Sequence, residues 1–301
     1  MKRFWKKILL FVLPIIVLFG IGEWTLRNAP NSYEYKSNYM DGHTGEIKIL
    51  ILGSSHGLFN IDPKYLKDKA FNLANVSQTI NYDYLLFNKF APKMDSLKYI
   101  ILPVSYFSLR EDLDDSAEDW RTAYYTTFYH ILPQKIDFKN FVLFSTLNYE
   151  TIERIINSLL DNNDKPTLNI YGFDTSYIIS KRNINWQYTG KIVVKRNTLS
   201  ISKNNLKNKN YIREMAETCN KNNISLILLT TPTWKTYRKY IDKKQMDEVR
   251  NYCELLSQEY NNVTYLNLFN DARFKNNDFF DTDHLSTKGA KKLTQILDMK
   301  L

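Results

Sequence analysis

In the segment Ile47-Lys48-Ile49-Leu50-Ile51-Leu52-Gly53-Ser54-Ser55-His56-Gly57, a short apolar run leads straight into a small polar turn. A mostly apolar run of this length is typical of a strand buried on both faces of a parallel sheet. Glycine and serine then supply ordinary turn chemistry. Since ligands of doubly wound folds bind at the carboxyl ends of strands, this turn is the first candidate for a functional site.

Further apolar runs alternate with segments of helical period toward the C-terminus. The runs are residues 70–73, 97–102, 224–230 and 263–268. The helical stripes are Ile212 to Cys219, Met246 to Leu256, and Ala290 to Leu297 behind a Ser286 cap. This alternation predicts an α/β, three-layer fold with a parallel five-stranded sheet in a domain that spans residues 47–301.

Residues 106–206 interrupt this rhythm. They hold an acidic start, an aromatic cluster from Trp120 to Tyr129, one helical segment around Ile152 to Leu160, and a basic polar tail. We expect an insertion between the third and fourth strands, packed over one edge of the sheet. Its aromatic side chains are suited either to a carbohydrate or acyl groove or to a small core of their own.

The N-terminus combines a basic cluster with an apolar run. Lys2, Arg3, Lys6 and Lys7 precede the uncharged segment 8–22, which approaches the length of a membrane span if the lysines snorkel. No small-x-small cleavage site follows, which favours an uncleaved signal anchor over 1–27 rather than a signal peptide. The charge asymmetry predicts a single pass through the cytoplasmic membrane with the rest of the chain outside. A polar linker is expected over 28–46.

Charge and cysteine content exclude two classes of protein. The net charge is +9, but the first 28 residues carry five basic residues against one acidic residue, and the remaining charge is dispersed. No nucleic-acid partner is therefore expected, because such partners require a concentrated basic stripe. Two cysteines are too few for a disulfide scaffold. Cys219 and Cys253 lie on apolar stripes of two helices, which we expect on opposite faces of the sheet, as buried free thiols.

A second chemical motif lies near the C-terminus, at Phe279-Phe280-Asp281-Thr282-Asp283-His284-Leu285. A serine hydroxyl becomes a nucleophile when an imidazole accepts its proton, and the imidazole needs a carboxylate to orient it. Asp281 and His284 can supply both groups from one turn, with Asp283 as the alternative carboxylate. No metal is expected at His56, Asp283 and His284, because the chain lacks a ligand pair at i, i+4 spacing there, and no cofactor is expected.

Together the two motifs resemble those of the SGNH or GDSL hydrolase superfamily. Gly53-Ser54-Ser55 is similar to the first block, Gly-Asp-Ser, and Asp281-x-x-His284 to the last. The resemblance covers residues 47–105 and 210–297. It implies that Ser55 is the nucleophile, His284 the general base and Asp281 the orienting acid.

The same resemblance implies an oxyanion hole. Ser77, in Asn75-Val76-Ser77-Gln78-Thr79, stands where the family has a glycine whose backbone N–H is a donor, and Ser105 stands where it has an asparagine. His56 follows the nucleophile, where it would either contact substrate or be held by packing.

An N-terminal anchor ahead of these blocks is also similar to DltD-like proteins and to anchored SGNH proteins that modify surface polymers. This implies an esterase or O-acyltransferase that works through a serine ester outside the membrane, with an acyl ester or glycan substrate and a multi-span membrane acyltransferase as a candidate partner. The alternative is a non-catalytic SGNH-fold protein for binding or assembly.

Overall fold

The computed structural model describes residues 1–145, 149–160, 166–200 and 203–301. Its backbone divides into two compact units. The anchor unit contains Met1–Ser37 and Ala117–Pro166, and the sheet unit contains Asn38–Ser116 and Thr167–Leu301.

The sheet unit is built on five parallel strands in the order β2-β1-β3-β4-β5. The strands are β1 (Ile49–Ile51), β2 (Ala70–Asn72), β3 (Tyr99–Pro103), β4 (Ser225–Thr230) and β5 (Val263–Asn267). In this register Leu50 faces Phe71 on one side and Ile100 on the other. Each strand falls inside or beside one of the predicted apolar runs, so the five-stranded parallel sheet is confirmed.

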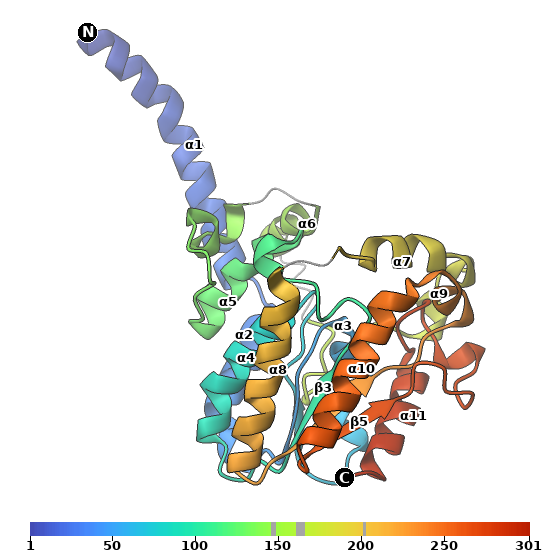
Figure 1. The fold of residues 1–301 in the computed structure, drawn as a ribbon. Coiled ribbons are helices and arrows are strands. Elements are labelled where there is room, and N and C mark those ends of the chain that lie inside the picture. The colour runs from blue at the N-terminus through green and yellow to red at the C-terminus, as the bar shows by residue number, and fades with distance from the viewer. Residues whose placement is uncertain (146–148, 161–165, 201–202) are drawn as a thin grey trace. The chain divides into compact units, whose positions relative to one another are not determined.

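Helices cover both faces of the sheet. Three of them, α4 (Ile80–Phe90), α8 (Lys203–Lys221) and α10 (Lys243–Glu259), lie side by side on one face (Figure 1). On the other face α11 (Thr287–Asp298) buries Leu293 and Leu297 against Ile51 and Ile227. Because side chains alternate along a strand, the intervening Leu50 and Ile100, which are also buried, face the three-helix layer.

The cysteine helices correct one expectation. Cys219 on α8 and Cys253 on α10 are buried and unpaired, as predicted. The two helices nevertheless share a face of the sheet, and the Tyr260 hydroxyl at the end of α10 donates to Glu217 Oε1 on α8 over 3.0 Å. Successive crossovers from β3 to β4 and from β4 to β5 advance in one direction along the sheet, so their helices fall on one side.

The anchor unit contains α1 (Lys2–Asn28), α5 (Thr122–Tyr129) and α6 (Tyr149–Leu159). α1 is long and apolar enough to cross a membrane. The aromatic cluster forms a buried core, because the Tyr33 ring packs on Tyr124 at 5.0 Å and on Tyr125 at 5.2 Å. Of the two interpretations of these side chains, the structure therefore favours the core.

Two expected boundaries differ from the structure. Residues 28–46 are not a linker, since they contain α2 (Ser32–His43), on which Tyr39 stacks against Phe71 with ring centroids 4.1 Å apart. The insertion 106–206 is not one body either: its middle part, 117–166, joins the N-terminal helix, and the rest belongs to the sheet unit with α7 (Gly190–Asn197). The sequence hides α2 because polar residues surround its few buried ones.

Candidate active site

The nucleophile candidate Ser55 is the first residue of α3 (Ser55–Leu58), directly beyond β1. Gly53 has φ +107°, and a Cβ there would lie 3.0 Å from Cδ of Pro103, so this turn requires glycine. Ser54 caps α3, with its hydroxyl accepting from the His56 N–H at 3.4 Å. A Cβ on Gly57 would lie 2.6 Å from the Leu52 carbonyl oxygen. The two glycines thus let α3 begin tightly against the end of the strand.

Ser55, His284 and Asp281 form one hydrogen-bonded chain. The Ser55 hydroxyl lies 2.8 Å from His284 Nε2, and His284 Nδ1 lies 2.9 Å from Asp281 Oδ2. The predicted residues come from opposite ends of the sequence, 229 positions apart, and meet at the carboxyl edge of the sheet. Their order of contacts is the one that activates a serine: hydroxyl to imidazole, imidazole to carboxylate.

Asp281 also builds the turn that holds the histidine. Its Oδ1 accepts from the backbone N–H of Asp283 at 3.0 Å and from that of His284 at 2.8 Å. The Leu285 N–H donates to Asn60 Oδ1 over 2.8 Å, which fixes the turn to the segment after α3. Asp283 is farther from the ring, with Oδ1 3.6 Å from Nδ1. Asp281 is therefore the carboxylate placed to orient His284.

The charges around His284 favour its protonated form. Burial alone would lower the pKa of this imidazole, but the negative charges of Asp281 and Asp283 outweigh it and raise the pKa to about 9. The same carboxylates stabilise the imidazolium that forms when the ring takes the serine proton.

His56 and Ser105 form a second pair beside the first. His56 Nδ1 lies 2.5 Å from the Ser105 hydroxyl, and Nε2 lies 3.5 Å from Asp283 Oδ2. Burial lowers the pKa of His56, whereas the neighbouring histidines hold the pKa of Asp283 well below its usual range despite burial. A neutral His56 facing an ionised carboxylate carries its proton on Nε2, so Nδ1 accepts the Ser105 hydrogen. Ser105 is thus bonded to His56, whose ring is 2% exposed and packs against Phe107 with ring centroids 5.5 Å apart.

Ser77 lies in the left-handed region, with φ 56°. Residues other than glycine rarely adopt this conformation, and the resemblance expects a glycine at this position. The structure brings Ser77 to the loop after β2, at the same edge of the sheet as Ser55.

A buried carboxylate that the sequence analysis missed supports this edge. Asp83 Oδ1 accepts from the Gly53 N–H and from Gln78 Nε2, both at 2.6 Å. Burial raises the pKa of Asp83 to about 7, although both hydrogen bonds oppose the shift. In the sequence, Asp83 could have been noticed only as an acid on the inner face of the helix now seen as α4. Periodicity alone does not distinguish such an acid from one on the surface.

Aromatic rings form a wall next to His284. Tyr177 stacks on Phe59 at 3.8 Å and on Phe280 at 4.1 Å between ring centroids, and meets the His284 ring edge-on at 5.5 Å. This wall contributes to the burial of His284, which is 8% exposed. Tyr177 lies in the insertion outside any motif, so the sequence did not identify it.

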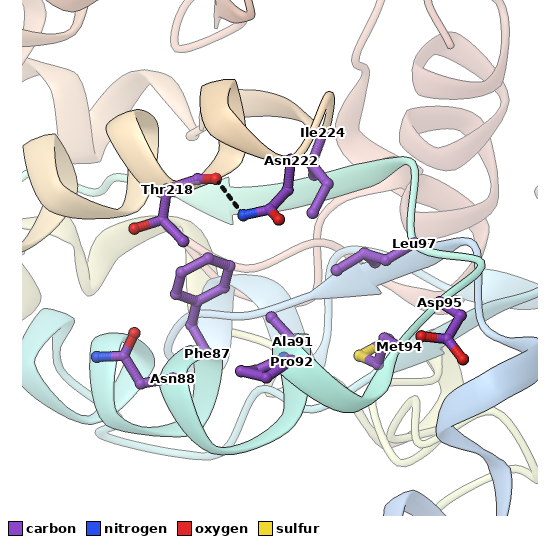
Figure 2. Close-up of a pocket in the computed structure, with 10 residues that line it drawn as sticks. All are labelled: Phe87, Asn88, Ala91, Pro92, Met94, Asp95, Leu97, Thr218, Asn222 and Ile224. Carbon is purple, nitrogen blue, oxygen red and sulfur yellow. Dashed lines mark hydrogen bonds between the residues drawn. The ribbon is translucent and has the colours of Figure 1, made fainter.

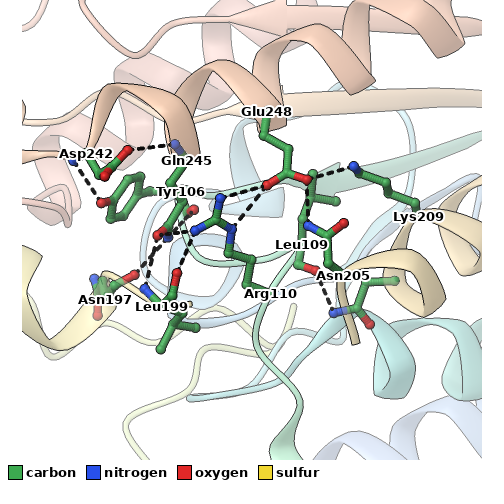
Figure 3. A network of polar contacts seen from close by, with 11 residues as sticks. Tyr106, Leu109, Arg110, Asn197, Leu199, Asn205, Lys209, Asp242, Gln245 and Glu248 are labelled. Atoms are coloured by element: carbon green, nitrogen blue, oxygen red, sulfur yellow. Dashed lines mark hydrogen bonds and ion pairs between the residues drawn. The ribbon is translucent and has the colours of Figure 1, made fainter. Parts of the chain in front are cut away.

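A polar network holds the segment that follows Ser105 (Figure 3). Arg110 donates to Glu248 Oε2 on α10 over 3.0 Å and to the Leu199 carbonyl over 2.6 Å. Gln245 Nε2 donates to the Tyr106 carbonyl over 2.9 Å. These bonds tie the end of β3 to α10, which fixes the backbone position of Ser105.

A pocket of about 290 Å³ lies elsewhere, between α4 and α8 (Figure 2). Leu97 and Ile224, which line it, precede β3 and β4. The pocket is therefore at the amino edge of the sheet, opposite to the edge that carries Ser55, and none of the predicted site residues lines it.

His56, Asp283 and His284 also place one ligand atom each within 4.8 Å of one another. Both ring nitrogens of His284 are already used, one by Ser55 and one by Asp281. A metal ion bound by His56, Asp283 and His284 would have to break one of the two hydrogen bonds of the His284 ring. The arrangement therefore suits nucleophilic chemistry better than metal binding.

Comparison with known proteins gives distant likenesses. A family model whose description names no activity matches residues 187–301, and no curated protein matches. Similar solved structures include a candidate platelet activating factor from Streptococcus pneumoniae, at 11% identity over 96% of this chain and 98% of that one with a TM-score of 0.45.

Two further solved structures are similar at the same level. A candidate lipolytic protein of the G-D-S-L family from Desulfitobacterium hafniense shares 13% identity over 84% of this chain and 99% of that one, with a TM-score of 0.42. A GDSL-like lipase from Bacteroides thetaiotaomicron shares 12% identity over 90% and 99%, with a TM-score of 0.41. These similarities are too distant to assign chemistry to the site, so its chemistry is inferred from its own geometry.

Proposed function

We propose that this protein is a membrane-anchored serine esterase or O-acyltransferase of the SGNH type. The observation that carries the proposal is the unbroken chain from the Ser55 hydroxyl through His284 to Asp281, with contacts of 2.8 and 2.9 Å. The positions of the two motifs on a parallel sheet of order 2-1-3-4-5 support it.

The chemistry follows from these contacts. Ser55 Oγ attacks the acyl carbonyl while its proton passes to His284 Nε2, and the tetrahedral oxyanion is held by the backbone N–H groups of Ser55 and Ser77. Collapse breaks the ester bond, and the leaving alcohol takes the proton from His284. Water or a glycan hydroxyl then attacks the Ser55 ester and passes its proton to His284. The bond from the acyl carbon to Ser55 Oγ breaks, and Oγ takes the proton back from His284.

The setting of the site suggests the substrate. α1 is suited to anchoring, and the basic cluster before it predicts that the sheet unit lies outside the cytoplasmic membrane. Because surface polymers are on that side of the membrane, we propose a cell-surface polysaccharide or related polymer as donor or acceptor. In a DltD-like role, a neighbouring multi-span membrane acyltransferase would supply the acyl group.

Turnover of p-nitrophenyl acetate by the full chain in detergent tests this function. Ser55→Ala and His284→Ala should each remove nearly all turnover, because nucleophile and base act as one unit. Ser54→Ala is the matched control, since its hydroxyl only caps α3, and it should keep most of the activity. Equal activity in Ser55→Ala and the unmodified protein would overturn the proposal.

The alternative is a non-catalytic SGNH-fold protein that binds or assembles surface polymer. The observation in its favour is Ser105, whose hydroxyl bonds to His56 where the family has an oxyanion-hole asparagine. Tight binding of polymer without any turnover, unchanged in Ser55→Ala, would favour this function.

A further inference from the structure

Helix α6 exposes a stripe of apolar side chains on the surface of the anchor unit. Ile152, Ile156 and Leu159 are 44%, 49% and 62% exposed and lie at i, i+4 and i+7, on one face. The other side of α6 is docked, with Thr151 buried and the Arg154 guanidinium 5.1 Å from the Tyr124 ring centroid. A surface helix in water normally shows the reverse arrangement.

A second group of exposed apolar side chains lies in the same unit, between α5 and α6. Phe138 is 71% exposed and Ile136 is 68% exposed, and Leu132 is also exposed. We call these three side chains and the α6 stripe the apolar collar; its members are Leu132, Ile136, Phe138, Ile152, Ile156 and Leu159.

The chain around the collar packs on the last third of α1. The Phe144 ring lies 5.3 Å from the Phe19 ring, and a Cβ on Gly22 would meet it at 3.2 Å. The Phe144 N–H donates to Glu23 Oε2 over 2.9 Å. Arg27 donates to the Phe141 carbonyl over 2.7 Å. α6 packs against α1 as well. The segment 141–144, which lies in the sequence between the two parts of the collar, is therefore fixed to α1 between Phe19 and Arg27.

This level on α1 coincides with a membrane boundary. A hydrocarbon core of about 30 Å is crossed by about 20 helical residues. Counting from Ile8, the first residue after Lys6 and Lys7, the span ends near Arg27. The docking residues thus lie in the outer part of the span, from Phe19 inside the hydrocarbon to Arg27 at its edge, and Glu23 and Arg27 are paired with each other at 2.6 Å. Apolar side chains exposed at this depth meet acyl chains instead of water.

We propose that the apolar collar lies in the outer interface of the lipid bilayer, so that the protein is held by one span and by an interfacial surface around its exit. The inference rests on the membrane anchoring in the proposed function and is independent of its chemistry. Interfacial burial of such an amphipathic helix scales with the apolar area inserted. Two attachments would fix the tilt of the anchor unit, which a lone span leaves free.

Nitroxide labels on the full chain test the collar. Single cysteines at Ile156→Cys and Phe138→Cys are labelled in vesicles of phosphatidylcholine with a minority of phosphatidylglycerol; native Cys219 and Cys253 are buried. Both labels should collide more often with oxygen, which concentrates in lipid, than with a water-soluble nickel chelate. The matched control is Glu153→Cys, exposed on the polar side of α6, which should prefer the chelate.

A label at Leu13→Cys separates the two ways of failing. If Leu13 is lipid-exposed while Ile156 and Phe138 favour the chelate as Glu153 does, the collar is overturned and the anchor stands. If Leu13 also favours the chelate, the anchor itself is wrong and the collar falls with it. Collar labels shielded from both relaxants would mean that protein covers the surface, which also overturns the proposal.

Discussion

Asp281 serves His284 in two ways, and its spacing in the sequence explains both. Three residues is the separation at which one carboxylate can accept the backbone N–H of His284 and its ring Nδ1 together, over 2.8 and 2.9 Å. The carboxylate and the imidazole are therefore positioned by the same turn. The residue pattern Asp-x-x-His could be predicted to supply this geometry from sequence alone.

The charge state of His284 predicts an alkaline pH profile. Only deprotonated His284 can accept the Ser55 proton, and Asp281 and Asp283 raise its pKa to about 9 against the effect of burial. We expect kcat/KM for p-nitrophenyl acetate to rise about tenfold per pH unit from pH 6 and to level off above about pH 9. Asp281→Asn should move this midpoint toward neutral pH and lower the plateau, because it removes a raising charge and the orienting acceptor. A midpoint near 6.5 in the unmodified protein would contradict the assignment.

Ser105 is expected to matter less than an oxyanion donor would. Its hydroxyl lies 2.5 Å from His56 Nδ1. With the proton of neutral His56 on Nε2, facing Asp283, the hydroxyl donates to Nδ1 and has no proton left for an oxyanion. Loss of a true donor costs about 100-fold or more in kcat, whereas we expect Ser105→Ala to lower kcat less than about tenfold. Steady-state kinetics of Ser105→Ala measure this effect. A 100-fold loss of kcat would show that the Ser105 hydroxyl donates to the reacting group.

At the scale of elements, the strands could be predicted and one helix could not. Central parallel strands are buried on both faces, so each left a continuous apolar run in the sequence, as β4 does. α2 gives no such pattern, because in the sheet unit its apolar residues are the buried Met40 and the half-buried Tyr39, and their neighbours are polar. α8 and α10 pack on the same face of the sheet because the two crossovers run in the same direction. No single segment of the sequence encodes that direction.

The contact between α3 and the sheet predicts a stability effect at Gly57. An added Cβ would lie 2.6 Å from the Leu52 carbonyl oxygen and 2.8 Å from Cβ of Ala74. Because backbone must move to make room, Gly57→Ala should lower the free energy of unfolding by about 1 to 3 kcal/mol. Urea unfolding in detergent measures this. Gly45→Ala is the control, since nothing lies within 4 Å of its Cβ, and an equal effect of both substitutions would contradict the packing described.

The buried Asp83 predicts how stability changes with pH. In the folded protein its pKa is raised to about 7 by burial, whereas in the unfolded chain it is about 4. Between these values the unfolded chain ionises Asp83 and the folded protein does not, so ionisation removes up to about 4 kcal/mol of stability as the pH rises from 4 to 7.

Asp83→Asn isolates this contribution. Asparagine keeps an oxygen that accepts from the Gly53 N–H and cannot ionise, so the variant should gain stability relative to the unmodified protein as the pH rises from 5 to 8. Thermal unfolding at both pH values measures the difference. An offset that does not change with pH would show that Asp83 is not buried as described.

For the whole molecule, the sequence predicted that Ser55, His284 and Asp281 come together, but not the division into two units. Ser55 and His284 could be found because each lies in a short motif after a recognisable strand or before a capped helix. The partition of 117–166 to the N-terminal helix depends on long-range packing such as Tyr33 on Tyr124, and no local pattern encodes it. Tyr177 could not be predicted for the same reason, since only the tertiary structure brings it next to His284.

Labelling by a fluorophosphonate probe, with mapping of the modified peptide by mass spectrometry, tests whether Ser55 is an activated nucleophile. Such probes react with a serine whose hydroxyl is activated by a base, so the full chain in detergent should carry the label on Ser55. The label should disappear in Ser55→Ala and His284→Ala and persist in Ser54→Ala. No labelling of the unmodified protein, or a label that persists in Ser55→Ala, would contradict the account of Ser55 as an activated nucleophile.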